Sequence, residues 1–383
     1  MKIFFRDRTK RKEPAMKTIH KTIPMPDDPY VSRYFSDSHA FFDIETTGFS
    51  AKTAFVYLIG LALRQENTIH IYQFLAENRR EEADLLLSFH KHLESIHTLI
   101  SFNGLGFDVP FLKSREQAAG LCCNWNPCQH LDLYKLTGKL AHLFHLPDKK
   151  QKSVERFLGI NRDDKYNGGE LIPVYYAYEK QQDPESERLL LLHNYEDVLG
   201  MTKLLSLLSY RDFLEGSITV SHASLQNHKC YNSDLEASEL LLTLKPPMPF
   251  PQKFLFQSDL CCLRCQDDSA KLLIPVFTGE LKFYYDNYKD YYYLPEEDMA
   301  IHKSVASFVD ASHRKKATAA TCYTKKSSSF LPQAEPLYTP AFYHEKKSSY
   351  SYFEMTEGFL SDTKALHAYA AHLLNVCLQK KGK

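Results

Sequence analysis

Residues 41–50 read "FFDIETTGFS", and this stretch indicates the fold more sharply than any other part of the chain. An aromatic pair precedes two carboxylates, Asp43 and Glu45, and a Thr-Thr-Gly ends the run. The pattern predicts a buried strand. Successive side chains of a strand alternate between its two faces, so Asp43 and Glu45 share one face at the C-terminal edge. Open α/β sheets bind ligands at that edge, and the pair is either an exposed strand end or half of a metal site.

The segments around this strand predict an α/β layer. Residues 54–64 ("AFVYLIGLALR") and 68–76 ("TIHIYQFLA") have the composition of two more strands. An amphipathic helix over 80–97, a strand over 98–103 and further helices, the last over 184–208, follow in order. We expect a mixed five-stranded sheet flanked by helices, an element order that resembles the ribonuclease H-like fold.

A third carboxylate, Asp108, lies in "SFNGLGFDVPFL" (101–112), directly after the predicted fourth strand. The Asn103-Gly104 pair permits a sharp turn, and Gly106 permits a close backbone approach. Asp108 would then begin the next helix. It is either the N-cap of that helix or a ligand at the same sheet edge as Asp43.

The late helix contributes "LLHNYEDVLGM" (191–201), in which His193 and Asp197 are four residues apart and share a helix face. A carboxylate in a leucine-rich stretch needs a partner, although a plain solvated face is the alternative. Together, Asp43, Glu45, Asp108 and Asp197 could converge from three elements. Oxygen ligands of this kind suit Mg²⁺ or Mn²⁺, and two such ions can activate water and stabilise the leaving oxygen of a phosphodiester.

The motifs "DIETTG", "NGLGFDVP" and "NYEDV" resemble, in order and spacing, those of the DEDD superfamily of 3′→5′ exonucleases. The likeness extends over residues 38–208 and is strongest to the bacterial YprB-type predicted exonucleases, through "HLDLYKL" and the 152–178 segment. The resemblance implies a ribonuclease H-like fold. It also implies that Asp43, Glu45, Asp108 and Asp197 bind two divalent cations, Mg²⁺ or Mn²⁺.

The resemblance also implies a general base on the last helix, a tyrosine four residues before the final aspartate or a histidine five before it. This chain departs from both patterns, because His193 stands four residues before Asp197. Histidine exchanges protons near neutral pH, so His193 is either the base or a structural histidine. His130 and Asp132, at another predicted strand end, are expected to support the site and not to bind the metal.

Outside this region the sequence predicts less. Residues 1–36 are expected to be an N-terminal tail, 37–210 the exonuclease domain, and 211–383 an α+β region rich in strands. Within the last, 270–285 ("AKLLIPVFTGELKFYY") suggests a hairpin turning at Thr-Gly, and 361–379 a helix capped by Asp362. The Cys262–Cys265 spacing is half of a zinc ligand set without a second half nearby, and buried thiols are the simpler interpretation.

Composition excludes some classes of protein. The formal net charge is zero, so nucleic acid is not indicated by global charge. No window approaches the length of a membrane span, and nine cysteines without a regular framework favour reduced thiols in the cytoplasm. We expect no membrane partner.

The function predicted from the sequence is a metal-dependent 3′→5′ exonuclease acting on single-stranded 3′ ends of DNA or RNA, with a helicase-like protein as a possible partner. Two alternatives remain open. The chain could be a catalytically weak or inactive ribonuclease H-like module that recruits nucleic acid or a partner, or it could be a structure-specific endonuclease.

Overall fold

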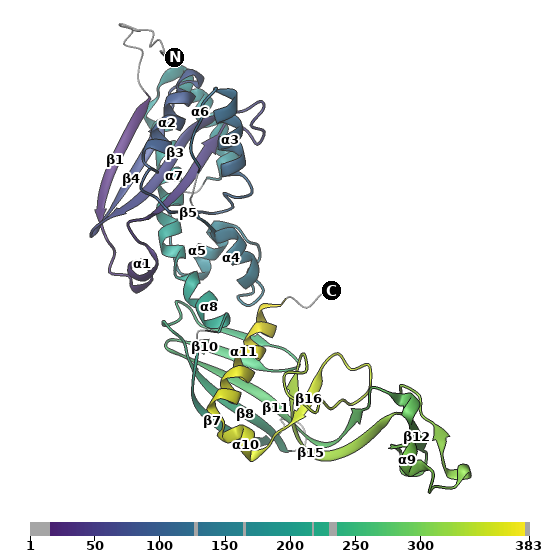
Figure 1. Cartoon of the computed structure of the whole chain (residues 1–383). Helices are drawn as coiled ribbons and strands as arrows, with labels where there is room; N and C mark the ends of the chain where they lie inside the picture. The colour runs from purple at the N-terminus through teal and green to yellow at the C-terminus, as the bar shows by residue number, and fades with distance from the viewer. Residues whose placement is uncertain (1–15, 126–128, 164–165, 217, 230–235, 380–383) are drawn as a thin grey trace, which may run out of the picture. The chain divides into compact units, whose positions relative to one another are not determined.

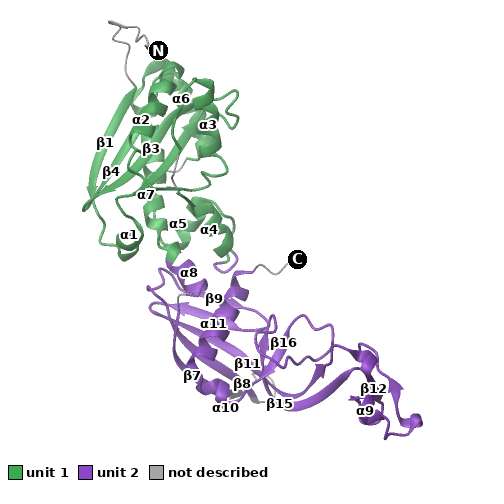
Figure 2. Cartoon of the chain, in the orientation of Figure 1, with its two compact units in different colours: residues 1–141, 145–208 green, residues 142–144, 209–383 purple. Residues whose placement is uncertain are grey.

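A computed structural model describes residues 16–125, 129–163, 166–216, 218–229 and 236–379 of the chain (Figure 1). The chain divides into two compact units (Figure 2). Unit 1 comprises residues 1–141 and 145–208, and unit 2 comprises residues 142–144 and 209–383. Each unit is described by itself below.

Unit 1 is built on one six-stranded sheet in the order β1-β4-β3-β2-β5-β6. The strands are β1 (Lys17–Pro24), β2 (His39–Thr46), β3 (Val56–Gln65), β4 (Thr68–Leu75), β5 (Thr98–Ser101) and β6 (Gln129–Asp132). The first four in this spatial order pair antiparallel, whereas β2, β5 and β6 pair parallel. Strand β2, which carries Asp43 and Glu45, therefore lies in the interior of a mixed sheet.

Helices cover both faces of this sheet. The helices of unit 1 are α1 (Pro29–Tyr34), α2 (Glu82–Lys91), α3 (Asp108–Ala118), α4 (Leu133–Leu140), α5 (Gln151–Phe157), α6 (Gly168–Gln181) and α7 (Pro184–Leu204), with a 3₁₀ turn, η1 (Arg79–Glu81), before α2. One core cluster joins β2 and β3 to α2 and α3, and a second joins β3 and β4 to α6 and α7. Burial on both faces explains why β3 is an almost continuous apolar run.

The ribonuclease H-like sheet expected from the sequence is confirmed, with one correction. The sheet has six strands and not five, because residues 17–24 of the expected N-terminal tail form β1 along β4. Ile19 and Ile23 alternate with polar residues in β1, and this edge strand buries only part of its length. A half-exposed edge strand carries a weak apolar signal, which explains the error.

Helix α8 (Leu207–Leu214) spans the boundary at residue 208, and unit 2 contains a seven-stranded sheet. Its strands are β7 (Thr219–Lys229), β8 (Glu236–Lys245), β9 (Phe254–Gln257), β10 (Cys262–Gln266), β11 (Ser269–Tyr284), β15 (Tyr323–Gln333) and β16 (Ser351–Glu354). A smaller sheet holds β12 (Tyr291–Leu294), β13 (Met299–His302) and β14 (Lys315–Lys316). Short helical segments are η2 (Tyr288–Asp290), α9 (Lys303–Ala306), η3 (Ala311–His313) and α10 (Glu357–Ser361), and the last helix is α11 (Thr363–Leu378).

In unit 2 the hairpin prediction is wrong and the helix-cap prediction is confirmed. The expected hairpin over 270–285 is wrong, because β11 is one 16-residue strand that pairs with β8 and β10 in its first half and with β15 in its second. Asp362 does cap α11, since its carboxylate accepts hydrogen bonds from the backbone N–H groups of Lys364 and Ala365 at 2.9 and 3.2 Å. Cys262 and Cys265 are three residues apart on β10 and face opposite sides of the sheet, so they do not share a metal ion.

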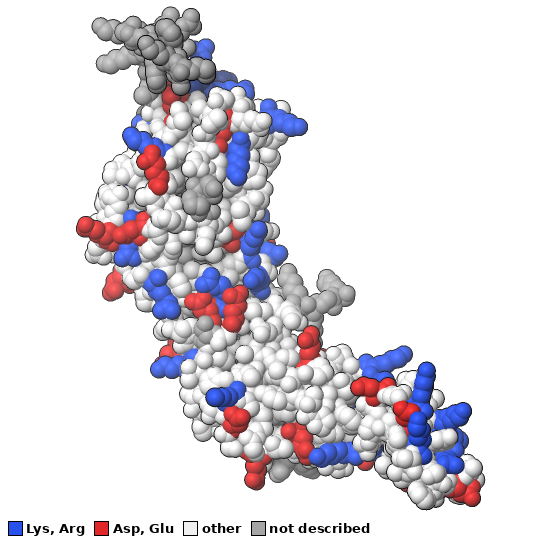
Figure 3. Space-filling view, viewed as in Figure 1, with Lys and Arg blue, Asp and Glu red and all other residues white. Residues whose placement is uncertain are grey.

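Two properties of the described residues bear on function, the character of the helices and the distribution of surface charge. Among the described residues, no helix has the length and apolar character needed to cross a membrane. On the face drawn in Figure 3, acidic and basic side chains are interspersed over the described part of both units, in keeping with the zero net charge. Any nucleic-acid contact would therefore rest on local groups.

Candidate active site

The two carboxylates of β2 lie at the centre of the candidate site. Asp43 pairs with Gly60 and Glu45 with Leu58 across the β2–β3 ladder, so both side chains leave the same face of the sheet. The side chain of Glu45 is 7% exposed, and Asp43 is only partly exposed. The ladder irregularity between Glu45 and Thr46 ends regular pairing just beyond them.

Asp108 joins this pair from the turn after β5. The turn begins at Asn103, which adopts a left-handed backbone (φ 71°), and Asp108 is the first residue of α3. Its Oδ1 accepts a hydrogen bond from the N–H of Ile44 at 3.3 Å, on β2 between the two carboxylates. Phe107 occupies the N-cap position, so the alternative of Asp108 as the capping residue is set aside in favour of a contact with β2.

Helix α7 supplies the remaining predicted residues. His193 Nε2 lies 3.5 Å from Oε1 of Glu45 and 3.3 Å from Oδ2 of Asp197. The three side chains offer ligand atoms that all lie within 4.8 Å of one another. His193 is therefore buried beside Glu45, and it is also a partner of Asp197, whose side chain is 19% exposed.

The carboxylates also interact electrostatically. Burial, followed by the charges of Asp197, Glu45 and Asp108, raises the pKa of Asp43 well above its ordinary value. Burial chiefly raises the pKa of Asp108 to about 7, with Asp132 and Asp197 contributing. Like charges at this proximity favour protonation unless a cation lies among them.

Two polar residues that the sequence analysis missed hold Asp43 in place. Asn194 donates from Nδ2 to Oδ2 of Asp43 at 3.3 Å, and Gln73 on β4 donates to Oδ1 of Asn194 at 3.1 Å. A Cβ at Gly60 would stand 2.2 Å from Oδ1 of Asn194, so the glycine makes room for this contact. Asn194 stands in the "HNYED" motif itself, and its position next to His193 was the available signal.

A buried ion-pair network, also missed, holds Asp197. The guanidinium of Arg162 contacts Oδ1 of Asp197, and its Nε lies 2.6 Å from Oε2 of Glu155, whose side chain is 1% exposed. Arg162 also donates to the carbonyl of Glu196 at 3.1 Å. Both Arg162 and Glu155 belong to the 152–178 segment of the resemblance, but nothing in their spacing links them to Asp197.

Asp132 and His130 hold the turn that leads to Asp108. Asp132 accepts hydrogen bonds from the N–H groups of Asn103 at 2.9 Å and Leu105 at 3.2 Å, and it also caps α4. His130 Nε2 lies 2.6 Å from Oγ of Ser101 on the adjacent strand. Both contacts fix the loop geometry.

This donor set fits a divalent cation. Oxygen-rich groups of carboxylates are the ligands preferred by Mg²⁺ and Mn²⁺. The raised pKa of Asp43, caused partly by three other carboxylates, indicates a negative field that such an ion would offset. His193 adds a nitrogen at the same place, which Mn²⁺ tolerates as a ligand and which can instead receive a proton.

Comparison with known proteins agrees with the topology. Residues 40–209 match the model of the RNase_H superfamily. The chain is 29% identical over 202 residues to the uncharacterized protein YprB of Bacillus subtilis (strain 168), across 52% of this chain and 47% of YprB. The chain thus spans about half the length of this relative.

Two solved structures show more distant similarity. The family B DNA polymerase of Pyrobaculum calidifontis matches 45% of this chain and 24% of its own, with 18% identity and a TM-score of 0.36. Escherichia coli exonuclease I in complex with a dT13 oligonucleotide matches 55% of both chains, with 10% identity and a TM-score of 0.32. Residues 40–209, which match the RNase_H superfamily model, thus have a ribonuclease H-like fold.

Proposed function

We propose that unit 1 is a metal-dependent 3′→5′ exonuclease that hydrolyses phosphodiester bonds at single-stranded ends of DNA or RNA. The observation that carries this proposal is the meeting of Asp43, Glu45, Asp108 and Asp197 with His193 at one edge of the sheet. The match of residues 40–209 to the RNase_H superfamily model and the likeness of the three motifs to the DEDD exonucleases support it.

The four carboxylates would hold two Mg²⁺ or Mn²⁺ ions. Bound ions of this kind neutralise phosphate charge and lower the pKa of water. Asn194 keeps the Asp43 carboxylate oriented, and Arg162 does the same for Asp197. Rigid orientation of these groups before substrate arrives reduces the reorganisation that hydrolysis would otherwise require.

His193 is proposed to orient and deprotonate the attacking water. Its Nε2 points between Glu45 and Asp197, so a water held by these carboxylates would lie within hydrogen-bonding reach of the ring. Asp197 follows His193 by four positions, about one turn of α7, and this spacing places both side chains on the same helix face. A tyrosine at the same spacing would occupy the same place.

Unit 2 is proposed to guide the nucleic-acid strand or to contact a protein partner of the helicase-like kind. Lys282 lies over the ring of Tyr323 and Arg314 over the ring of Tyr292, so cations and aromatic rings adjoin in this unit. Such pairs can stack on bases and neutralise phosphates. The free thiols of the described cysteines suit the cytoplasmic location that we propose with this substrate.

The test is hydrolysis of a 5′-labelled single strand by the purified chain with Mn²⁺ or Mg²⁺. We expect products that shorten from the 3′ end, and we expect EDTA to stop the reaction. Asp43→Asn should lower the rate at least about a hundredfold, since the metal site contributes several kcal/mol. Asp84→Asn, an exposed carboxylate of α2 in the same unit, is the matched control and should keep full activity.

Two further measurements separate the alternatives. A circular single strand has no end, so its cleavage would favour a structure-specific endonuclease. His193→Gln should lower kcat by about 10²- to 10⁴-fold while leaving metal binding largely intact. Strand binding without cleavage of any substrate, in any divalent cation, would contradict the proposed enzyme and favour a binding module.

A further inference from the structure

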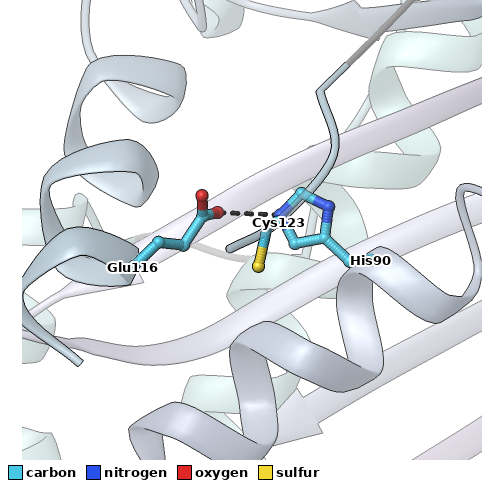
Figure 4. A group of neighbouring side chains, drawn as sticks. All are labelled: His90, Glu116 and Cys123. Atoms are coloured by element: carbon cyan, nitrogen blue, oxygen red, sulfur yellow. Dashed lines mark hydrogen bonds and ion pairs between the residues drawn. The ribbon is translucent and has the colours of Figure 1, made fainter. Parts of the chain in front are cut away.

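A second group of metal-binding side chains lies in unit 1 and uses none of the five residues proposed above. His90 comes from the last turn of α2, Glu116 from the last turn of α3, and Cys123 from the segment that follows α3 (Figure 4). One ligand atom from each of the three lies within 4.8 Å of the others. Nitrogen, oxygen and sulfur donors from three separate segments thus meet at one point.

Glu116 is the fixed member of this group. Its side chain is 6% exposed, its Oε1 lies 2.8 Å from Nε2 of His90, and its Oε2 accepts a hydrogen bond from Nε1 of Trp125 at 2.8 Å. A carboxylate this deeply buried needs a compensating positive charge. A protonated His90 would supply it in a simple ion pair, and so would a bound metal ion.

Cys123 distinguishes these two explanations. An ion pair between His90 and Glu116 has no use for a thiol beside the carboxylate, whereas a thiolate is a strong ligand for zinc. The Trp125 N–H on Glu116 also has the form of an outer hydrogen bond that orients a ligand carboxylate. The mixed donor set selects a borderline ion such as Zn²⁺ over Mg²⁺ or Mn²⁺.

The surroundings leave space for a fourth ligand. A cavity of about 370 Å³ is lined by His90, Cys123 and Trp125, among others. A water molecule in this cavity would complete the four-coordinate geometry that zinc adopts. Three protein ligands and one exchangeable position form a coordination shell that zinc adopts in proteins.

We propose that His90, Glu116 and Cys123 bind one Zn²⁺ ion through Nε2, a carboxylate oxygen and Sγ, with water as the fourth ligand. The ion joins α2, α3 and the segment after α3. Helix α3 begins at Asp108, eight residues before Glu116 and about 12 Å along the helix. Zinc at this position therefore stabilises the helix that carries one of the catalytic carboxylates.

The chain contains one tryptophan, Trp125, and this gives the site its own optical signal. The experiment is a titration of the reduced, chelator-stripped full chain with Co²⁺, a paramagnetic substitute for zinc. We expect quenching of Trp125 fluorescence and a near-ultraviolet thiolate-to-cobalt absorption band, both reversed by one equivalent of Zn²⁺. Thiol ligation requires loss of a proton, so affinity should fall in acid.

Matched variants locate the ligand. Cys123→Ser should abolish the thiolate band and weaken Co²⁺ binding at least tenfold, and His90→Gln should weaken it by a similar factor. Cys122→Ser, the exposed neighbouring thiol, should keep both signals, as should Asp43→Asn, which belongs to the proposed nuclease site. Circular dichroism verifies that each variant is folded.

Several results would overturn the zinc site. These are absence of the thiolate band in the unaltered chain, its survival in Cys123→Ser, or its equal loss in Cys122→Ser. A nuclease that fails to cleave any strand while Co²⁺ still gives the thiolate band would refute only the proposed hydrolysis. The two proposals therefore fail separately.

Discussion

At the scale of single residues, the candidate site offsets its negative charges in two different ways. Asp197 is paired with the cation of Arg162, whereas Asp43 receives a neutral amide N–H from Asn194 and Asp108 a neutral backbone N–H from β2. A neutral donor stabilises a buried carboxylate less than a cation does. Burial raises the pKa values of Asp43 and Asp108, and these neutral donors offset only part of that effect, so the charge of the site depends on pH and on divalent metal.

The raised pKa values predict that the metal-free protein loses stability as the pH rises from about 4 to about 7. The pKa of Asp108 is about 7 in the folded chain against an ordinary value of 3.8, so in this window the folded state holds a proton that the unfolded state has released. The free energy of unfolding should fall by up to about 1.4 kcal/mol per pH unit for this group. Above pH 7 this contribution is lost.

Urea unfolding in EDTA, compared between the unaltered chain and Asp108→Asn, measures this effect. The asparagine keeps the shape of the side chain without the titration, so the difference between the two curves should shrink in acid and widen as the pH approaches 7. Mn²⁺ should flatten the slope of the unaltered chain. Parallel pH profiles in EDTA would contradict the assignment, and Asp84→Asn controls for loss of an ordinary carboxylate.

Arg162 is predicted to position Asp197 as well as to stabilise unit 1. Arg162→Met leaves Glu155 buried without its cation, which should cost about 3–5 kcal/mol of unfolding free energy. Adding Glu155→Gln removes the uncompensated charge, so the double variant should regain most of that stability. Nuclease activity should stay low in both variants, because Asp197 has lost its contact in each.

Thermal and urea unfolding of the single and double variants, each with a rate measurement, separate positioning from stability. Recovery of activity together with stability would show that Arg162 is purely structural. Arg188→Met is a suitable control, because Arg188 forms an exposed pair with Glu185 on the same helix as Asp197. Exposed pairs of that kind contribute little to stability.

At the scale of elements, the sequence predicted those strands and helices that have a clear local hydrophobic pattern or a capping residue. The apolar runs of β2 to β5, the amphipathic α2 and the capped α11 follow from spacing and caps, and each is present. Edge strand β1 was missed because half of it is polar, and β11 was divided at Thr278-Gly279 because that pair is also a turn signal. Gly279 instead has an extended backbone within the β11–β15 ladder.

In the candidate site, too, the residues specified by local motifs could be predicted, and those positioned by tertiary packing could not. Asp43 and Glu45 follow from a strand end, Asp108 from a helix start, and His193 and Asp197 from their spacing within α7, so local motifs suffice to single out these five positions. Arg162 and Glu155 could not be linked to Asp197 in this way, since their contacts depend on how the 152–163 segment packs on α7. Contacts between segments distant in sequence are set by tertiary packing, which periodicity does not encode.

Strand β3 and helix α7 approach closely at Gly60, and we predict that both the stability of unit 1 and its nuclease rate depend on this contact. A methyl group at Gly60 would lie 2.2 Å from Oδ1 of Asn194 and 2.7 Å from Cγ2 of Val198. Gly60→Ala should therefore cost about 1–3 kcal/mol and displace Asn194 from Asp43, lowering the nuclease rate. Gly138→Ala is the control, since its new methyl group comes no closer than 3.7 Å to Nζ of Lys149.

Gly138 lies inside helix α4, where alanine is favoured over glycine by about 1 kcal/mol. The two glycine variants should therefore shift the urea midpoint in opposite directions. A Gly60→Ala chain with unchanged stability and rate would mean that α7 moves away from β3 without consequence. That result would also weaken the role assigned to Asn194.

At the scale of the whole molecule, each unit has its own sheet and its own buried core. In unit 1 the core clusters lie on the two faces of the six-stranded sheet. In unit 2, a cluster around Leu281 and Phe330 packs within the larger sheet, and α11 is tied to it by a hydrogen bond from Tyr369 to the carbonyl of Pro332 at 2.7 Å. Separate cores make separate unfolding the expected behaviour.

We therefore predict two thermal transitions, of which only the transition of unit 1 responds to Mn²⁺. Trp125 lies in unit 1 and is the sole tryptophan, so its fluorescence follows that unit, while far-ultraviolet circular dichroism follows both. At a hundredfold excess of Mn²⁺ over its Kd, binding should add about 2.7 kcal/mol to unit 1, a rise of roughly 5–10 °C. Asp108→Asn should abolish most of that rise and leave the second transition in place. A single transition that Mn²⁺ shifts as a whole would show that the two units unfold together. If Mn²⁺ instead shifted only the transition that Trp125 fluorescence does not report, the divalent ion would bind outside unit 1.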